Sequence, residues 1–485
     1  MLFNSIIFLC FFVLVFFAHW FIFSKNAKWQ NSFLLVTSFV FYSFWDWRFL
    51  FLLIFSISSV YLIGERIDKL NDEISRKRWM RFGVFLSLGV LFFFKYFNFF
   101  TDSIFNLLHS IGIQPNFQLL NIVLPVAISF YTFHGVSYVL DIYHRKIQST
   151  KSWLDYALFV SYFPLLVAGP IERATHLLPQ LRTKRIFSRS DVKEGLSLML
   201  WGFFKKIAVA DSLGTIANMV FESHSEYSSI GHLFGAFIFA LQIYADFSGY
   251  TDIARGVSRF FGIQLLLNFN FPYFSRSIPE FWSRWHISLS SFLNDYVFLP
   301  LALFFRNHGK WGIFISIFIT FLISGFWHGA GWNFVFWGSL HGLYYLPQFL
   351  KKGKKLKSIF GNKSSDQGWL SNFSNRLLTF SLVVLALIFF RSKTISDGFY
   401  FVYEVFVNKS FFAPQELLKT STHLIVLLKG LAAACLVFGI EYLFFKRTRK
   451  LEHLIDNKLK VVVICLLLLF FGSFENSLEF IYFQF

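Results

Sequence analysis

The chain has 485 residues, of which 55% are hydrophobic, 22% aromatic and only 15% charged, and its formal net charge is +18. A soluble domain typically carries about 25% charged residues, and 73 phenylalanines are more than a water-soluble core of this size can bury. This composition excludes an ordinary soluble domain and indicates an integral membrane protein. The basic residues form short clusters between apolar runs instead of one continuous face, which argues against a nucleic-acid-binding protein.

Apolar runs that approach the ~20 residues needed for a membrane-spanning helix recur along the chain. The first run follows no basic residues and contains no small-residue cleavage site, so it is interpreted as a membrane span and not as a cleavable signal. The pattern predicts an all-α polytopic membrane protein with about ten to eleven transmembrane helices in a single domain over residues 1–485. The main runs are residues 2–23, 33–63 as a hairpin turning near 45–48, 82–100, 377–390, 424–445 and 461–471.

Clusters of lysine and arginine between these runs predict the orientation, because basic loops stay on the cytoplasmic side of a membrane. Residues 101–120 contain no lysine or arginine, and residues 222–230 carry only acidic charges, so both are expected to face outward. Counting the spans from these loops places the N-terminus and the tail at residues 475–485 outside the membrane. The clusters expected in the cytoplasm are 25–28, 66–81, 145–151, 173–193, 351–357 and 446–460.

Two apolar segments are too irregular to form a simple span. Residues 155–171 contain Pro164, and residues 265–291 contain Pro272 and Pro279. Proline breaks helices, and irregular backbone in a membrane is stable only when it is buried in protein or lines a cavity. Both segments are therefore expected to be re-entrant pieces around a central site.

Polar residues within apolar runs are costly in a membrane and are therefore candidates for function. The first candidate is His328, which follows Trp327 and precedes Asn333 in a glycine-rich interruption of the apolar stretch 311–349. That stretch is about twice the length of one span, so it predicts two helices that meet near the histidine. An intramembrane histidine can instead simply hydrogen-bond between helices, and this alternative stays open.

A second cluster covers residues 280–296 and contains Arg284, Trp285, His286 and Asn294. Its alternative interpretation is an interfacial amphipathic helix whose arginine extends toward the headgroups, which suits Arg284 better than His286. The third cluster places Asp246 and Asp252 at the end of an apolar helix. For these two carboxylates a structural ion pair with Arg255, Arg259 or Arg284 is favoured over direct catalysis.

Histidine is suited to taking a proton from a hydroxyl and returning it, because its unperturbed pKa is about 6.5. A hydroxyl that attacks a thioester needs such a base. The chain has no G-x-S-x-G or H-E-x-x-H sequence, which argues against a serine-hydrolase or zinc-protease site. Cys10, Cys435 and Cys465 lie in apolar runs without metal-ligand spacing, so neither a metal nor a cysteine nucleophile is expected.

Four stretches together resemble the membrane-bound O-acyltransferase family, and most closely its bacterial branch of alginate and peptidoglycan O-acetyltransferases and teichoic acid D-alanyltransferases. They are residues 124–133, 168–173, 246–256, and 281–286 continuing to 324–331. One departure is Pro-Leu-Ala-Leu at residues 300–303, where many relatives carry a glycine pair.

The resemblance implies a helical shell in which a funnel from outside meets a tunnel from the cytoplasm, in a bacterial inner membrane. It assigns His328 as the catalytic histidine and His286 as the second. It also implies a cytoplasmic acyl thioester such as acetyl-CoA as the donor, with no bound cofactor. The expected partners are a surface polysaccharide acceptor, membrane lipid and an esterase-like SGNH-type transferase outside. Residues expected to support the site or line the substrate are Trp327, Asn333, Trp285, Arg284, Asp246, Asp252 and Asn294.

Residues 479–485 resemble the short aromatic motif of the small membrane partner in the D-alanyl system, which implies that Tyr482 carries the acyl group transiently. A phenol ionises near pH 10, so its ester keeps a high transfer potential. The alternative is an aromatic anchor at the membrane interface.

The favoured function is O-acylation of an extracytoplasmic polysaccharide such as alginate, peptidoglycan or another cell-surface polymer, with acetyl favoured over D-alanyl. The main alternative is a transporter or flippase of a lipid-linked or acylated substrate, with histidine and aspartate as a proton relay. A scaffold that only recruits an enzyme is disfavoured, because it has no need of costly polar groups inside the membrane.

Overall fold

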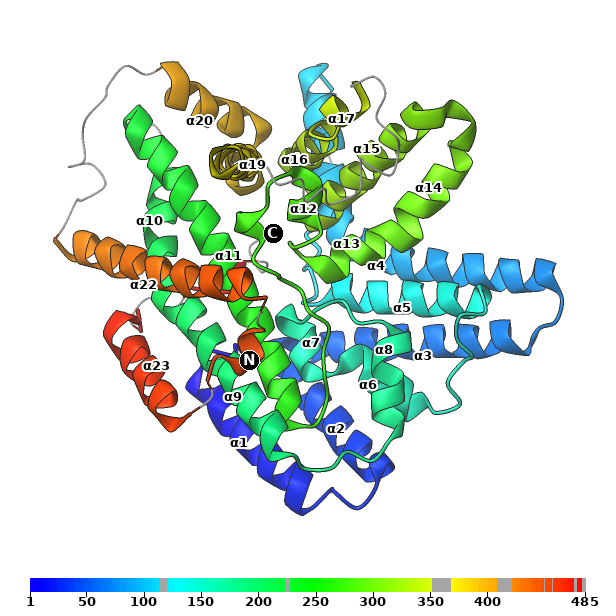
Figure 1. The fold of residues 1–485 in the computed structure, drawn as a ribbon. Coiled ribbons are helices and arrows are strands. Elements are labelled where there is room, and N and C mark those ends of the chain that lie inside the picture. The colour runs from blue at the N-terminus through cyan, green and yellow to red at the C-terminus, as the bar shows by residue number, and fades with distance from the viewer. Residues whose placement is uncertain are drawn as a thin grey trace. The chain divides into compact units, whose positions relative to one another are not determined.

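The structure is a computed structural model that describes residues 1–113, 120–222, 227–350, 368–407, 421–448, 450–455, 457–474 and 478–481. Throughout these residues the regular elements are helices, and none of the described residues forms a strand (Figure 1). A helix satisfies its own backbone hydrogen bonds, which is why a chain in lipid without a closed barrel is helical. The predicted all-α fold is confirmed.

Seven helical segments in the described part of the chain are long and apolar enough to cross a membrane, judged by length and composition. Two further apolar helices, Ile6–Phe21 and Trp153–Leu166, are shorter. The protein is therefore a multi-pass membrane protein, as predicted, although these seven segments alone do not reach the expected ten to eleven. The seven are Arg48–Lys69, Glu73–Ser110, Ser229–Phe260, Ile287–Phe304, Arg306–His328, Trp369–Arg391 and Ser421–Lys446.

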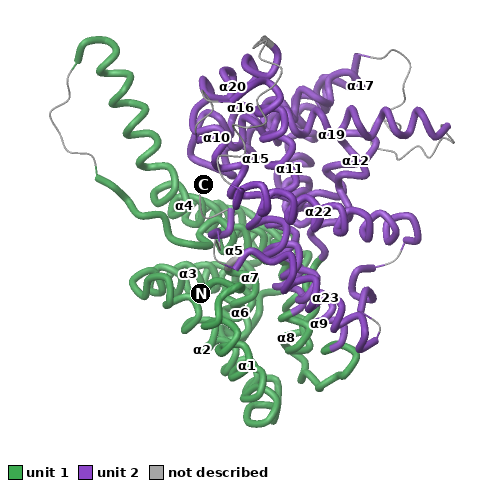
Figure 2. The backbone as a smooth tube through the Cα atoms, turned by 90° about the vertical axis from the view of Figure 1, so that its left-hand side faces the viewer, with its two compact units in different colours: residues 1–192, 257–266 green, residues 193–256, 267–485 purple. Residues whose placement is uncertain are grey.

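The chain divides into two compact units, which Figure 2 shows in different colours. Unit 1 consists of residues 1–192 and 257–266, and unit 2 consists of residues 193–256 and 267–485. The prediction of one domain over residues 1–485, with a separate tail at 475–485, stays a prediction.

Unit 1 confirms two local predictions about helix ends. One helix ends and the next begins at Trp47, between α2 and α3, where the turn of the hairpin was expected. The segment 155–171 is broken at Tyr162, between α6 and α7, and Pro164 lies in the first turn of α7, where its missing N–H costs nothing. The helices of this unit are α1 (Ile6–Phe21), α2 (Ala27–Asp46), α3 (Arg48–Lys69), α4 (Glu73–Ser110), α5 (Ile128–Tyr143), α6 (Trp153–Ser161), α7 (Phe163–Ala168) and α8 (Ala174–Arg182).

Unit 2 contains most of α9 (Arg189–Phe203) and of α11 (Ser229–Phe260), with the π-helix η1 (Phe204–Ala210) and α10 (Asp211–Glu222) between them. Four short elements follow the broken segment and lead into the long helices. These short elements are η3 (Pro272–Phe274), α12 (Ile278–Trp282), α13 (Ile287–Leu293) and η4 (Asn294–Phe298). The later elements are α14 (Leu299–Phe304), η5 (Arg306–His308), α15 (Gly309–His328), α16 (Trp332–Leu343), α17 (Leu346–Leu350), α19 (Trp369–Arg391), α20 (Ile395–Val407), α22 (Ser421–Lys446), η6 (Leu451–His453) and α23 (Lys458–Phe471).

The non-helical backbone before α12 in unit 2 is stabilised by a second irregular stretch. The N–H of Ile287 donates to the carbonyl of Asn268 (2.9 Å), and the N–H of Asn270 donates to the carbonyl of Arg284 (2.9 Å). Backbone inside a membrane protein needs such partners when it is not helical. The predicted break in residues 265–291 is confirmed by these contacts, whereas their re-entrant course stays a prediction.

The helices α15 and α16 pack against each other. A side chain at Gly325 would collide with the carbonyl of Phe334, and one at Gly338 would collide with the carbonyl of Phe321. Small residues at both contact points therefore let the two backbones approach closely, which is a common packing mode in membranes. The stretch 311–349 forms two helices that meet beside His328, as predicted.

Candidate active site

His328 is the last residue of α15 and is buried, with 4% of its surface exposed. Its ring makes edge-to-face contacts with Trp327 and Trp337, each with ring centroids 4.9 Å apart, and with Phe390 at 5.5 Å. The glycine after it leaves the helix in an extended conformation. The helix end thus fixes an imidazole within a shell of aromatic rings.

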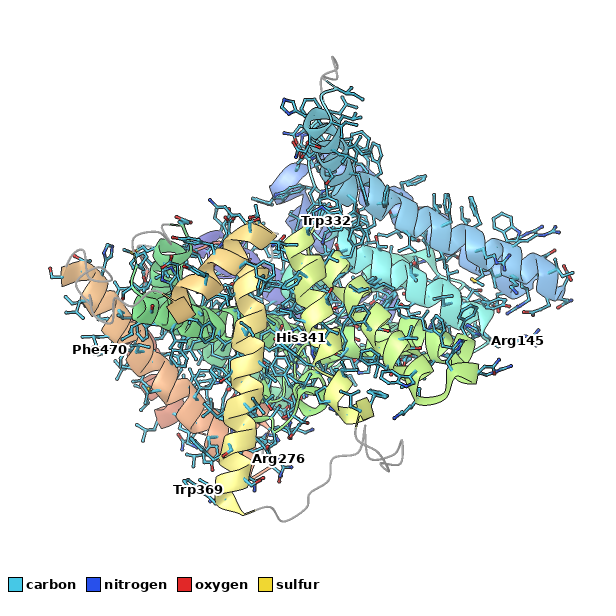
Figure 3. The ribbon with its side chains drawn as sticks, turned by 90° about the horizontal axis from the view of Figure 1, so that it is seen from above. Arg145, Arg276, Trp332, His341, Trp369 and Phe470 are labelled. Atoms are coloured by element: carbon cyan, nitrogen blue, oxygen red, sulfur yellow. The ribbon has the colours of Figure 1, made fainter. Side chains whose placement is uncertain are left out.

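A second imidazole belongs to His341 on α16, which is labelled in Figure 3. It lines the same narrow cavity as His328. The indole nitrogen of Trp282 lies 3.3 Å from Nδ1 of His341. Because an indole N–H can only donate, Nδ1 is the acceptor and the ring proton is on Nε2. The free space of this cavity admits about one water molecule, so an acyl group can enter only when the aromatic walls move apart. The other lining residues are Ile243, Phe281, Trp285, Trp337, Val383, Leu387 and Phe390.

His286 is completely buried and adopts a left-handed backbone conformation (φ 43°, ψ 53°) at the start of α13. Such a conformation is uncommon for a residue with a side chain and costs on the order of 1 kcal/mol or more. It persists because Ile287, the next residue, is hydrogen-bonded to Asn268. Strained backbone of this kind is frequent at functional sites.

The tautomer of His286 can be assigned from its hydrogen bond to Asn268. The backbone N–H of Ser288 donates to Oδ1 of Asn268 (3.3 Å), and since an N–H can only donate, this atom is the amide oxygen. Nδ1 of His286 lies 3.0 Å from the same oxygen and must also donate to it. The proton therefore resides on Nδ1, and Nε2, which has no hydrogen-bond partner among the described residues, is left as an acceptor.

Trp327 lies between two of the histidines. Its ring centroid is 6.2 Å from that of His286 and 4.9 Å from that of His328. Trp285, also predicted from the sequence, packs on Phe281 and lines the cavity. The structure thus brings His286, His328, Trp327 and Trp285 together in one buried centre. We call His286, His328, His341 and Trp327 the histidine centre.

Three other predicted residues neither line the cavity beside His328 nor belong to the histidine centre. Asn333 is buried and donates to the carbonyl of Ser392 (2.8 Å), which ties the start of α16 to the end of α19. Arg284 pairs with Glu280 (3.1 Å). Asn294 is exposed and donates to the neighbouring Asp295 (3.0 Å). Their contacts fit support of the fold better than contact with a reactant.

The predicted ion pairing of Asp252 is observed, but its main partner is a lysine. Nζ of Lys205 lies 2.6 Å from Asp252 and 3.8 Å from Glu441, and all three side chains are buried. Arg255, one of the predicted partners, lies 3.5 Å from Asp252. The hydroxyl of Tyr244 donates to Glu441 (2.7 Å), so this group connects η1, α11 and α22 through buried charge.

Asp246 pairs with the adjacent lysine. Nζ of Lys206 lies 2.9 Å from Asp246 and 2.7 Å from Asp211, with all three residues buried. Two carboxylates around one ammonium leave this group with excess negative charge when all are ionised. The charge cluster is defined here as Lys205, Lys206, Asp211, Asp246, Asp252 and Glu441.

Sequence reasoning missed several of these residues. Lys205 and Lys206 lie in the apolar run 198–210, where a positive pair is a clear signal of buried ion pairing. Asn268 is a single amide in a broken segment, and its position beside His286 depends on tertiary structure. Tyr482, the predicted acyl relay, lies outside the described residues.

Unit 1 holds its own buried carboxylate, Glu172, in one of the stretches that carry the family resemblance. Oε1 accepts the N–H of Leu266 (2.6 Å), and Oε2 lies 2.8 Å from Nδ1 of His176. Burial raises the pKa of Glu172, and the hydrogen bond to Glu172 raises the pKa of His176. The pair fixes the loop before α8 to the backbone at Leu266.

The helical bundle with buried imidazoles defines a multi-pass membrane protein with a site suited to proton transfer. The model of the membrane-bound O-acyltransferase family matches residues 145–392. The chain is 36% identical to the probable alginate O-acetylase of Pseudomonas aeruginosa, over 81% of this chain and 73% of that protein. It is 34% identical to the peptidoglycan O-acetyltransferase of Helicobacter pylori, over 82% of this chain and 78% of that protein.

A more distant relative is the teichoic acid D-alanyltransferase of Bacillus subtilis, which is 27% identical over 52% of this chain and 66% of that protein. The chain therefore belongs to the membrane-bound O-acyltransferase family and is an O-acyltransferase. This membership favours acyl transfer over the transport alternative.

Proposed function

We propose that the protein transfers an acetyl group from a cytoplasmic acyl thioester, such as acetyl-CoA, toward a polysaccharide on the outer side of a bacterial inner membrane. The observation that carries this proposal is the presence of two buried imidazoles, His328 and His286, that both contact the ring of Trp327. The cavity beside His328 is lined mainly by aromatic and aliphatic side chains, which strengthens each hydrogen bond made to a reacting group.

In the proposed reaction His328 acts as the general base. It takes the proton of an acceptor hydroxyl while the hydroxyl oxygen attacks the thioester carbonyl carbon. The new C–O bond forms, the C–S bond breaks, and the proton passes to the departing thiolate. His286, whose Nε2 is an acceptor, orients the hydroxyl or assists the proton transfer.

The acceptor that first receives the acyl group is proposed to be the phenol of Tyr482, with direct transfer to the polymer as the alternative. The names of the relatives support an acetyl group and an extracytoplasmic polymer of the alginate or peptidoglycan kind. An SGNH-type esterase-like partner outside the membrane would complete the transfer. The termini are proposed to lie on that outer side, as the basic loops predict.

Covalent labelling tests the reaction. Purified protein incubated with [14C]acetyl-CoA is expected to retain base-labile label, and His328→Ala is expected to lose it while remaining in the membrane. His308→Ala is the matched control, because His308 is exposed on η5 in the same unit. Undiminished label in His328→Ala would refute the assigned role of His328.

The label also separates the enzyme from a transporter. A transporter would move an acylated substrate without forming a protein ester, and its His328→Ala variant would change uptake and not thioester cleavage. The acceptor polymer is tested by measuring ester-linked acetate on surface polysaccharides from cells with and without the gene. Ester-linked D-alanine in place of acetate would reassign the acyl group but keep the enzyme class.

A further inference from the structure

Residues 478–481, which precede Tyr482, enter the interior of unit 2: Glu479 is exposed and Leu478 partly exposed, whereas the two residues after them are buried. Phe480 and Ile481 are 0% and 1% exposed, and residues 478–480 are not helical. The backbone groups of such a segment have no partners within the segment itself. In a membrane protein they must find partners elsewhere, because unsatisfied backbone groups cost several kcal/mol.

The partners are two members of the charge cluster. Nζ of Lys206 donates to the carbonyl of Leu478 (3.0 Å), and the N–H of Ile481 donates to Oδ2 of Asp246 (2.8 Å). Lys206 and Asp246 also pair with each other at 2.9 Å. One ion pair thus holds the segment at both ends through its backbone, independently of the side chains.

Apolar contacts hold the side chains of the same segment. The ring of Phe480 packs on Tyr250 (centroids 4.5 Å apart) and lies 5.8 Å from Phe247. Leu478 lies against Gly214 of α10, where a Cβ atom would come within 2.5 Å of its Cδ1. The missing side chain at Gly214 therefore creates the space that Leu478 occupies.

We propose that Lys206, Asp211 and Asp246, together with the space at Gly214, form a binding site for an extended peptide segment whose inward-facing side chains are apolar, occupied here by residues 478–481. Burying Lys206 and its two carboxylates costs desolvation free energy, and apolar side chains could join α10, α11 and η1 without that cost. The site explains their presence, since they satisfy an unpaired carbonyl and an unpaired N–H that hydrophobic packing could not satisfy.

The site also places the end of the segment near the histidine centre. Phe247, which contacts Phe480, makes an edge-to-face contact with His286 (4.8 Å, 89°). The bound segment is therefore one aromatic side chain away from the histidine centre. If Tyr482 is the acyl carrier, the site holds the residue directly before the carrier. This role in acyl transfer rests on the proposed function, whereas the binding site itself does not.

Cysteine protection tests the site in the full chain. The three native cysteines are exposed or partly exposed, so they are first replaced by serine. Ile481→Cys in that background is expected to react with a maleimide at least 10-fold more slowly in native protein than in denatured protein. Adding Gly214→Val or Phe480→Ala is expected to restore most of the reactivity, because each removes an apolar contact of the segment.

Gly439→Val is the matched control for Gly214→Val, because nothing lies within 4 Å of a Cβ placed at Gly439 on α22. Phe480→Ala alters only the segment, so it remains informative if Gly214→Val fails to fold. The proposed site would be refuted if Ile481→Cys reacted rapidly with the maleimide in the otherwise unaltered fold. It would also be refuted if Ile481→Cys stayed fully protected both after Gly214→Val and after Phe480→Ala was added. Unchanged acetyl transfer in Tyr482→Phe would instead show that Tyr482 is not the acyl carrier. If Ile481→Cys were still protected from the maleimide, the binding site would remain supported.

Discussion

Unit 2 buries two polar centres of opposite chemical character. The histidine centre consists of imidazole and indole rings, in which an amide oxygen accepts a hydrogen bond from His286 and an indole N–H donates one to His341. The charge cluster consists of ammonium and carboxylate groups that lie 2.6–2.9 Å apart in its three closest pairs, Lys205–Asp252, Lys206–Asp211 and Lys206–Asp246. A neutral imidazole can accept and release a proton, whereas a tight ion pair resists any change of charge. We infer that the first centre reacts and the second holds structure.

The largest expected effect is a loss of acetyl-transfer activity on changing the histidine centre. His328→Ala should lower acetyl transfer about 1000-fold, within the range of a lost general base, while the amount of folded protein stays the same. Initial rates with [14C]acetyl-CoA and size-exclusion profiles in detergent measure the two quantities. A variant that is equally active, or that loses activity only because it aggregates, would contradict the assignment of His328 as the reacting group.

The second prediction concerns stability. Lys206→Met leaves Asp211 and Asp246 without their cation, and breaking a buried pair in this way costs about 3–5 kcal/mol. The unfolding midpoint in detergent is expected to fall accordingly. Lys393→Met is the control, because Lys393 is exposed. If both variants unfold at the same midpoint, the cluster does not stabilise the fold and the contrast between the centres fails.

The third prediction concerns the tautomer of His286. Asn268→Ala removes the acceptor for the Nδ1 proton and should lower acetyl transfer about 10- to 100-fold, since a misplaced reacting group costs that much. Asn268→Asp keeps an acceptor and should recover activity at high pH. Its carboxylate stabilises the protonated imidazole, so the acid limb of the pH–rate profile should move to higher pH. Identical profiles in Asn268→Asp and the unaltered protein would show that Asn268 has no role in positioning His286.

The smallest expected effect comes from Glu172 and His176 in unit 1, a pair whose histidine is partly exposed. It provides a comparison for the fully buried pairs of the charge cluster. Glu172 raises the pKa of His176 in the folded protein, so protonated His176 stabilises the fold. This stabilisation is complete below about pH 6.5, the pKa of histidine in the unfolded chain, and is lost as pH rises through the higher pKa of the folded protein. The unfolding temperature should fall by about 1–2 °C from about pH 6 to about pH 9, because water around the partly exposed His176 weakens its pair with the buried Glu172. His176→Gln should flatten that slope; an unchanged slope would assign it to other groups.

The membrane segments were predictable from the sequence because apolar length and helix breakers act locally. Trp47 ends one helix and begins the next where the hairpin was expected, and the glycines around His328 separate α15 from α16. His286 and His328 were also identified by their chemical character within apolar surroundings. In each case the information lies within one short stretch of the chain.

The partners of these residues were not predictable in the same way. Asn268 precedes His286 by a broken segment, and only the folded backbone brings the two side chains within 3.0 Å. Asp246 was expected to pair with an arginine, yet Lys206 reaches it from η1. No spacing rule connects a π-helix to residues 40 positions later.

The π-helix also has a consequence for how the chain can tolerate insertion and deletion. In η1 the N–H of Asp211 bonds to the carbonyl of Lys206, one residue further back than in an α-helix. This widened turn amounts to one extra residue. Because the turn absorbs this residue, Asp211 lies one turn above Lys206, as the fourth residue onward would in a regular α-helix. Removing one residue between Ile207 and Ala210 would therefore restore a regular helix and leave Asp211 facing Lys206 and Gly214 facing Leu478. The loss of a single codon here should be tolerated better than the same loss within α10, where it would rotate the rest of the helix by about 100°.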